Sequence, residues 1–302
     1  MACRLSVIVS TLNRPDQVVE CIRTILANDG DFEIVIVDQS APAISDQART
    51  AVGTDPRLVW ISSATRGLST SRNVAVSAAH GFILAFTDDD CRVSRDWVAG
   101  IDQLFAADPE LAILFGAVIL TPEDRAKGYA AEFEPGETRT FQHGLPDLRT
   151  QWGIGANMTI RRKVFDTVGL FDIQLGAGTP FPAGEEMDLT IRALTAGFKV
   201  VQTPRVQVTH LGVRVGAAAS TLMRGYGVGL GAMLAKHVRL GTPGAAYVLT
   251  HWIALHSGRM LSRALRGHRQ PGFGLLASVL QGVYRSWRTP IDKARRVYSG
   301  AP

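Results

Sequence analysis

The sequence contains little cysteine and no long apolar run. Its three cysteines, Cys3, Cys21 and Cys91, are odd in number and far apart, so neither a disulfide framework nor a zinc knuckle is indicated. A reducing cytoplasm fits this usage best. No stretch reaches the roughly 18 consecutive apolar residues of a membrane-spanning helix, because even residues 245–255 are interrupted by polar side chains. The N-terminus lacks a secretory signal pattern. We therefore expect a chain that is neither secreted nor inserted across a bilayer.

Acidic residues are nearly absent from the last third of the chain. Residues 205–302 contain 14 Lys and Arg but a single acid, Asp292, whereas residues 1–204 contain 18 Lys and Arg against 26 Asp and Glu. The overall charge of +5 therefore divides into −8 for the first part and +13 for the second. A basic segment next to an acidic one predicts contact with something anionic, either a membrane surface or a nucleic acid.

The first half of the chain repeats one pattern, in which a short apolar run ends in a polar residue and leads into a helical segment. The runs cover residues 5–9, 34–37, 58–61 and 82–86. Strands this uniformly apolar are typical of a parallel sheet covered by helices on both faces, so we predict an α/β fold. Ligands bind beyond the carboxyl ends of such strands. The polar residues that follow each run are therefore the candidates for a functional site.

Three consecutive acids, Asp88, Asp89 and Asp90, follow the fourth run. Alternate residues of an extended chain point the same way, so Asp88 and Asp90 are expected to face one point and Asp89 another. Two converging carboxylates suit a hard divalent cation that also binds substrate phosphates, and this pattern predicts a diphosphate site. The alternative is a solvated acidic turn. A calcium loop of the EF-hand type is excluded, because Val93 and Ala99 stand where it needs glycine and glutamate.

Together with five other short segments, the acidic run resembles the family 2 glycosyltransferases of the GT-A fold. The segments occur in the family's order across about the first 212 residues: 6–11 with 13–15, 36–38, 66–73, 88–90, 184–189 and His210. The resemblance implies a Rossmann-like, mostly parallel sheet and an inverting, metal-dependent transfer of a sugar from a nucleoside diphosphate.

The resemblance also implies which residues hold the nucleotide-sugar. Thr11 and Asp38 would bind the nucleotide, and the Asp38 carboxylate would accept a hydrogen bond from a base N–H group. Asp38 could equally be a turn residue at a strand end, and Arg72 could simply pair with a surface carboxylate. The full set of donor-binding candidates is Thr11, Asn13, Arg14, Asp38, Arg66, Arg72, Asn73, Asp88 and Asp89.

Glu186 stands where the family usually has an aspartate that acts as the general base. The pair Glu185-Glu186 replaces the commoner Glu-Asp, which keeps the carboxylate but lengthens its reach, so Glu185 and Asp188 are also catalytic candidates. A carboxylate suits the role because it can take the acceptor's proton while the nucleotide leaves from the opposite face. The alternative is that these acids only favour the positive end of a helix.

His210 follows an expected strand, and the resemblance implies that it completes the metal shell with Asp88 and Asp90, around Mg²⁺ or Mn²⁺. A histidine at a strand end could also be purely structural. In the second half of the catalytic region, Trp152, Gly155 and Asn157 are the candidates for the acceptor side.

We predict a catalytic domain over residues 1–215, with a nucleotide-sugar half at about 1–100 and an acceptor half at about 101–215, and a basic amphipathic helical tail over 216–302. The glycines of 225–231 lack the G-x-G-x-x-G spacing of a dinucleotide site and predict close helix packing. A stripe of apolar side chains at helical spacing predicts a helix that lies on a membrane. The stripe comprises Leu276, Val279, Leu280, Val283 and Trp287.

Upstream of that stripe, Trp252, Ile253 and Leu255 precede Arg259, Arg263, Arg266 and Arg269, which adds positive charge beside apolar side chains. The tail could instead pack on the catalytic domain, or on a second copy of the chain in a homodimer. Nucleic-acid binding is disfavoured, because the aromatic residues of the tail lie among aliphatic ones at helical spacing.

The predicted function is transfer of a sugar from a UDP donor, with dTDP and GDP donors as alternatives, to a hydroxyl of a saccharide or lipid-linked saccharide. Surface polysaccharide synthesis at the cytoplasmic face of the membrane would suit such an enzyme. The alternatives are an anionic-surface or nucleic-acid binding protein and a nucleotidyltransferase. The last needs a glycine-rich loop near the first strand, and residues 10–14 contain no glycine.

Overall fold

The computed structural model describes residues 4–142, 145, 152–265 and 273–300, with backbone alone for 259–265 and 273. The N-terminal half alternates strands and helices, as the apolar runs predict. The four strands are parallel and lie in the order β3-β2-β1-β4, so their carboxyl ends meet at one edge of the sheet. These elements are β1 (Leu5–Thr11), α1 (Pro15–Leu26), β2 (Phe32–Asp38), α2 (Pro42–Val52), β3 (Leu58–Ser62), α3 (Leu68–Ala78) and β4 (Ile83–Asp88).

The second part of the catalytic region extends the same sheet. The order continues β4-β8-β6-β9-β5, with β8 antiparallel to both its neighbours, and β7 pairs with β9. Among the described residues, nine strands thus form one mixed sheet. The added elements are β5 (Cys91–Val93), α4 (Trp97–Ala107), β6 (Leu111–Ile119), α5 (Pro122–Lys127), β7 (Arg139–Phe141), η1 (Gly155–Asn157), β8 (Met158–Arg161), α6 (Lys163–Val168), α7 (Glu185–Thr195) and β9 (Lys199–His210).

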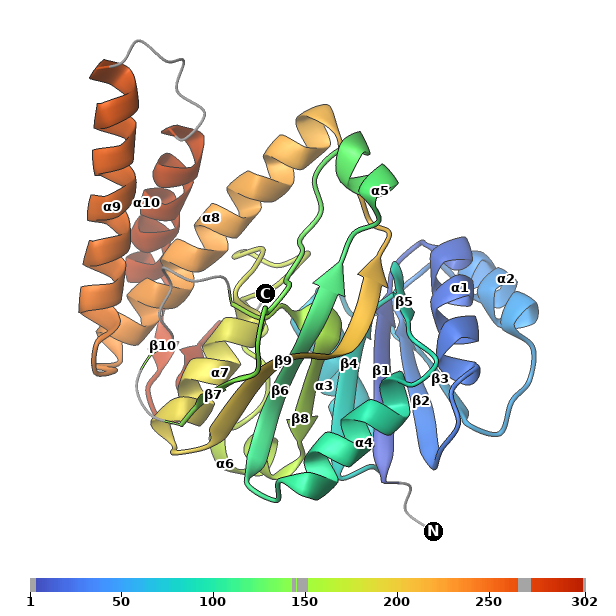
Figure 1. Cartoon of the computed structure of the whole chain (residues 1–302). Helices are drawn as coiled ribbons and strands as arrows, with labels where there is room; N and C mark the ends of the chain where they lie inside the picture. The colour runs from blue at the N-terminus through green and yellow to red at the C-terminus, as the bar shows by residue number, and fades with distance from the viewer. Residues whose placement is uncertain (1–3, 143–144, 146–151, 266–272, 301–302) are drawn as a thin grey trace.

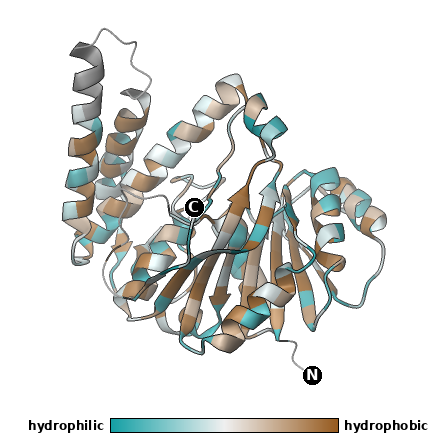
Figure 2. Ribbon diagram, viewed as in Figure 1, coloured by the Kyte–Doolittle hydropathy of each residue, from teal (hydrophilic) through white to brown (hydrophobic). Residues whose placement is uncertain are grey.

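Helices cover both faces of this sheet, with α4 in front of it and α3 behind it in Figure 1. Every residue of β2 is buried, and the strands are brown along most of their length in Figure 2. Burial on both faces explains the continuous apolar runs of the sequence. The α/β class with a mostly parallel first half and a C-terminal helical extension is confirmed.

The extension consists of α8 (Gly216–Arg239), α9 (Ala245–Leu265), α10 (Phe273–Arg288) and the small pair β10 (Ile291–Asp292) and β11 (Val297–Tyr298). Helix α8 runs from the neighbourhood of α5 to α9 and α10 (Figure 1). A Cβ atom on Gly231 would lie 2.0 Å from the carbonyl oxygen of Val279, so α8 and α10 touch backbone to backbone. The glycines of 225–231 are therefore packing residues, as predicted.

The extension shares a hydrophobic cluster with the catalytic region. Met233 of α8 and Tyr298 of β11 pack in this cluster with Leu175 and Phe181. Of the predicted apolar stripe on α10, Val279 is buried and Val283 packs against the same cluster. Part of the stripe therefore faces the protein. None of the described helices combines the length and hydropathy needed to cross a membrane.

Candidate active site

A cavity of about 680 Å³ opens where the first strands of the sheet end. Most of the residues proposed from the sequence meet in its wall although they come from both halves of the catalytic region. They are Thr11, Arg14, Arg66, Arg72, Asp88, Asp89, Asp90, Trp152, Gly155, Glu185, Glu186 and His210.

The acidic turn at the end of β4 is held by hydroxyl and guanidinium groups. Asp89 accepts a hydrogen bond from the Thr11 hydroxyl at 2.7 Å, and one nitrogen of Arg14 contacts both Asp89 and Asp90, at 2.9 and 3.1 Å. Asp88 contacts Arg72 instead, at 3.2 Å. The prediction that Asp88 and Asp90 face one point and Asp89 another is wrong for this turn. Strand β4 ends at Asp88, so the alternation of an extended chain stops there, and Asp89 and Asp90 share Arg14 as a partner.

The three carboxyl groups differ in their electrostatic environment. Burial raises the pKa of Asp89 to about 6, and the nearby Asp90 charge adds to this, while Arg14 opposes it. Burial acts on Asp90 in the same direction, but its contacts with His210 and Arg14 prevail and hold its pKa below the usual value. Asp90 is thus ionised more readily than Asp89, as a ligand for a cation must be.

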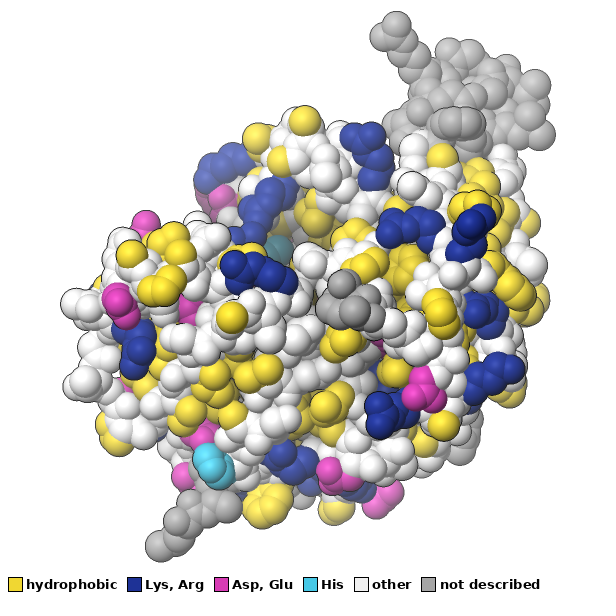
Figure 3. Space-filling view, turned by 180° about the vertical axis from the view of Figure 1, so that it is seen from behind, with side chains coloured by type: hydrophobic (Ala, Val, Ile, Leu, Met, Phe, Trp, Pro, Cys, Tyr) yellow, Lys and Arg dark blue, Asp and Glu magenta, His cyan; other side chains and the backbone are white. Residues whose placement is uncertain are grey.

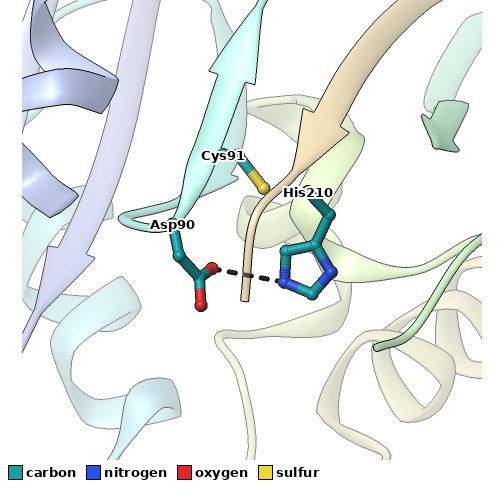
Figure 4. A group of neighbouring side chains, drawn as sticks. All are labelled: Asp90, Cys91 and His210. Carbon is teal, nitrogen blue, oxygen red and sulfur yellow. Dashed lines mark ion pairs between the residues drawn. The ribbon is translucent and has the colours of Figure 1, made fainter. Parts of the chain in front are cut away.

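His210 reaches the acidic turn because of strand register. Residues Cys91 and His210 are paired across β5 and β9, which places the imidazole beside Asp90 at the sheet edge. Its Nε2 atom lies 3.3 Å from a carboxylate oxygen of Asp90, and its Nδ1 atom lies 3.1 Å from the carbonyl oxygen of Ala131 (Figure 4). A carbonyl at Nδ1 fixes the ring and leaves Nε2 toward the turn, as in metal-binding histidines.

The residues present fit a divalent cation. Ligand atoms of Asp90, Cys91 and His210 lie within 4.8 Å of one another, but burial raises the pKa of the Cys91 thiol well above its usual value, so the sulfur stays protonated. Carboxylate and imidazole groups remain as ligands, which suits Mn²⁺ or Mg²⁺. A Cβ atom on Gly212 would lie 2.1 Å from an oxygen of the Asp90 side chain and 3.0 Å from Nε2 of His210, so a larger residue there would displace these two side chains.

Helix α7 brings two more acids to the cavity. It begins after Gly184, whose φ of +95° is a left-handed conformation that favours glycine. Glu185 is buried and accepts a hydrogen bond from Arg72 at 3.0 Å. The Oε2 atom of Glu186 is shielded from solvent and has no hydrogen-bond partner among the described residues. Burial and the adjacent Glu185 raise the pKa of Glu186 to about 8.

Asp188, the third acid of α7, is removed from the catalytic candidates. It is completely buried and contacts Lys236 at 2.7 Å, His237 at 2.9 Å and Arg192 at 3.1 Å. It does not line the cavity. Helical geometry explains the correction, because a residue two positions after Glu186 points away from it, into the protein.

The profile of glycosyl transferase family 2 matches residues 6–169, which is more than half of the chain. The chain belongs to this family. A glucosyl-dolichyl phosphate glucuronosyltransferase of Haloferax volcanii is 25% identical over 68% of this chain and 69% of its own length. The uncharacterized glycosyltransferase EpsJ of Bacillus subtilis is 35% identical over 59% of this chain and 54% of its own length.

Solved structures agree on the fold. The mannosyltransferase PcManGT from Pyrobaculum calidifontis, solved with GDP-Man and Mn²⁺, matches with a TM-score of 0.63 and 17% identity, over 95% of this chain and 88% of the other. At that identity the match shows the fold alone, which is the predicted GT-A type. Family membership favours sugar transfer over the nucleotidyl-transfer and surface-binding alternatives.

Several family-motif residues support the site without lining the cavity. Asp38 is buried and accepts a hydrogen bond from the backbone N–H group of Ser40 at 2.9 Å, which is the turn role considered as the alternative. Asn13 is exposed at a φ of +56° and its N–H group donates to the Ser40 hydroxyl. The Asn73 amide binds the backbone of Phe171 through both its atoms.

Asn157 of the predicted acceptor side is buried in the protein interior. Its amide donates to the carbonyl oxygens of Ala117 and Val206 and accepts from the indole of Trp97. It therefore joins strands β6 and β9 and cannot contact an acceptor. Trp152 and Gly155, the other two candidates for the acceptor side, do line the cavity. The indole nitrogen of Trp152 has no hydrogen-bond partner in the described residues.

Sequence reasoning missed the wall that the extension contributes. The missed lining residues from α8 are Leu222, Tyr226, Leu230 and Met233, and from earlier in the chain Gln39, Tyr129 and Arg214 were also missed. The rings of Tyr129 and Tyr226 meet edge to face with centroids 6.5 Å apart. For these missed residues the sequence offered one signal: Arg214 follows Gly212 by two positions and so lies close to the predicted site residue His210. Lys and Arg side chains surround a hollow on the face drawn in Figure 3.

Proposed function

We propose that this family 2 glycosyltransferase is metal-dependent and inverting. One observation carries the proposal: the Asp90–His210 pair lines the same cavity as Glu186, whose Oε2 atom has no hydrogen-bond partner among the described residues. The first supplies ligands for a cation that binds a diphosphate, and the second supplies a base. A sugar held between them would be attacked on one face and would lose its nucleotide from the other.

Asp88, Asp90 and His210 would hold Mn²⁺ or Mg²⁺, which when bound stabilises the negative charge of the leaving diphosphate. Arg14 and Arg66, both at the cavity, are the cations proposed to contact the donor phosphates. Arg72 connects the two halves of the site, because it contacts both Asp88 and Glu185. It keeps the acidic turn and the start of α7 at a fixed separation.

Glu186 is the proposed general base. Its carboxylate takes the proton of the acceptor hydroxyl as that oxygen forms a bond to the anomeric carbon, and the bond between this carbon and the diphosphate oxygen breaks. The products are the new glycoside, with inverted configuration, and a nucleoside diphosphate. The buried Oε2 atom of Glu186, which has no hydrogen-bond partner among the described residues, supports this proposed role.

The donor and the acceptor are proposed as classes. The name of the Haloferax volcanii relative contains a lipid phosphate. The solved structure of PcManGT contains GDP-Man and that of S. aureus TarS contains UDP-GlcNAc, so both UDP and GDP sugars enter the test. We propose a saccharide or lipid-linked saccharide as acceptor, and peripheral contact with the cytoplasmic face of a membrane through the extension. Of the predicted basic residues there, Arg266 and Arg269 lie outside the described residues, as do the side chains of Arg259 and Arg263.

The test combines titration and turnover. Isothermal titration of UDP-, GDP- and dTDP-sugars in Mn²⁺ and in EDTA should show binding of one donor class only with the metal. Glu186→Gln should bind that donor normally but turn over roughly 10²- to 10⁴-fold more slowly, because the amide cannot take a proton. Donor affinity that is equal in EDTA contradicts the metal assignment, and normal turnover by Glu186→Gln contradicts the base assignment.

A further inference from the structure

Helix α8 belongs to the C-terminal extension, yet its backbone touches the loop that precedes the proposed base. A Cβ atom on Gly229 would lie 2.4 Å from the carbonyl oxygen of Ala183, which is far closer than a methyl group can approach. From the other side, a Cβ atom on Gly184 would lie 3.4 Å from the carbonyl oxygen of Gly229. Gly184 is the N-cap residue directly before the first residue of α7. The position of α8 therefore limits where the first turn of α7 can lie.

A buried ionic cluster makes a second connection between the same two helices. Lys236 of α8 contacts Asp188 of α7 and Asp172 of the preceding loop, both at 2.7 Å. His237 contacts Asp188 as well, at 2.9 Å. All four side chains are completely buried, and burial lowers the pKa of His237, so the imidazole is neutral.

The charges of this cluster balance one another, and the cluster also includes the backbone of β11 near the C-terminus. Two acidic side chains, Asp172 and Asp188, face two basic ones, Lys236 and Arg192. Asp172 also accepts a hydrogen bond from the backbone N–H group of Tyr298 at 2.8 Å. Buried charges of this kind fix a geometry, because any displacement leaves a charge without its partner.

We infer that α8 is a positioning element of the catalytic centre, which holds the first turn of α7 so that Glu186 lies at its place in the cavity. The inference rests on the proposed role of Glu186 as the base. It gives the extension a part in catalysis apart from any contact with a membrane. The same helix supplies Tyr226, Leu230 and Met233 to the cavity wall, so base and acceptor would be aligned by one element.

Gly229→Ala tests the inference in the full-length chain. The added methyl group must displace the Ala183 carbonyl and with it the start of α7. We expect kcat to fall roughly 10²-fold, the cost typical of a misplacement of about 1 Å. The KM for the donor and the Mn²⁺ titration should stay within about twofold of the wild type, because the acidic turn lies on other elements.

Two alanine variants on the same helix serve as matched controls. A Cβ atom on Gly225 would lie 3.4 Å from Pro182, which is an ordinary contact, so Gly225→Ala should keep kcat within about twofold. Alanine also favours a helix more than glycine does. Gly231→Ala places its methyl group 2.0 Å from the Val279 carbonyl, on the α10 side. It should lower the Tm without a comparable loss of kcat.

The outcomes separate this inference from the function on which it rests. A selective loss of kcat in Gly229→Ala supports it, whereas equal kcat for Gly229→Ala and Gly225→Ala overturns it. An equal loss in Gly231→Ala also overturns it, because loose packing of the extension would then be the cause. If Gly229→Ala does not fold, Met233→Ala decides: the loss of its side chain from the hydrophobic cluster that it shares with Ile191 of α7 should cost kcat roughly tenfold, and normal kcat overturns the inference. Normal turnover by Glu186→Gln instead contradicts the assignment of the base.

Discussion

At the scale of single residues, the environment of Glu186 is unfavourable for a charge. Its buried oxygen has no partner in the described residues, and the neighbouring Glu185 carboxyl group repels it. Arg72 is the nearby cation that opposes this effect, and the Tyr226 hydroxyl is also close enough to interact. A strongly shifted pKa of a group that lines a cavity is typical of a functional site. The raised pKa means that the Glu186 carboxylate holds a proton more tightly than an exposed glutamate does, which suits a general base.

The raised pKa of Glu186 predicts a pH-dependent loss of stability. The group ionises at 4.5 when exposed and at about 8 in the folded protein, so the folded state binds a proton that the unfolded state has lost between these values. Compared with a protein that has an uncharged residue at this position, the free energy of unfolding therefore falls as pH rises from 4.5 to 8, and the difference stays constant above pH 8. Glu186→Gln removes the titration, so its Tm advantage over the wild type should grow across that window.

Thermal unfolding at several values of pH between 5 and 9 measures this difference. Glu123→Gln, at an exposed position on α5, is the control and should follow the wild type at each pH. A Tm difference between Glu186→Gln and the wild type that does not change with pH would contradict the raised pKa. Because the readout is unfolding, it does not depend on finding the substrate.

Asp188 illustrates a residue whose role is structural. Burial opposes its ionisation, but Lys236, Arg192 and His237 hold its pKa below the usual range. Asp188→Asn should destabilise the fold by about 3–5 kcal/mol, because the two cations lose a buried partner. We expect a fall in Tm of roughly 10 °C, with no change for Asp16→Asn at an exposed helix start. A fully stable Asp188→Asn protein without turnover would return Asp188 to the catalytic candidates.

At the scale of elements, the site depends on the pairing of β5 with β9. That register brings His210 to Asp90, although the two residues are far apart in the sequence. Asp90→Asn should weaken Mn²⁺ binding in the presence of nucleotide at least about tenfold, because an amide is a poorer ligand for a hard cation. The free Mn²⁺ signal in electron paramagnetic resonance measures the affinity. Asp102→Asn, whose carboxylate pairs with Arg4, should leave it unchanged, and equal affinity in both variants would contradict the assigned ligand.

The sequence predicts the secondary-structure elements and the sheet edge at which the site lies better than it predicts where individual side chains point. Apolar runs marked β1 to β4, and the polar residues at their ends indicated the cavity, because buried parallel strands have this simple pattern. Asp188 and Asn157 were misplaced for a different reason. Most of their partners, such as His237 for Asp188, are separated from them by dozens of residues, and no local pattern reveals such contacts. The wall from α8 was missed for the same reason.

At the scale of the whole molecule, the basic extension presents two different faces. The face of α10 toward α8 contains Val279 and Val283, which the protein covers. The outer face carries Leu280, Tyr284 and Trp287, which are 46%, 60% and 59% exposed. Trp252, predicted to lie near a membrane, is instead buried and stacks on His256 of the same helix. The outward face of α10 is therefore an exposed apolar surface of the extension, within the described residues, that is open to a partner.

The outward face of α10 predicts binding to anionic membranes. Arg288 lies over the ring of Tyr284 with its guanidinium carbon 5.5 Å from the ring centroid, and Arg239 lies 5.6 Å from that of Trp287. Exposed aromatic rings with cations beside them suit the lipid interface, where each Lys or Arg near the surface contributes about 1 kcal/mol.

The full-length protein should co-sediment with vesicles that contain phosphatidylglycerol and less with phosphatidylcholine alone. Tyr284→Ser combined with Trp287→Ser should lose this binding, and Phe82→Ser, at an aromatic side chain that is 61% exposed next to β4, should keep it. Negligible binding of the folded wild type to both kinds of vesicle would leave a second copy of the chain as the partner of this face, because exposed aromatic residues on a helix also suit a protein contact.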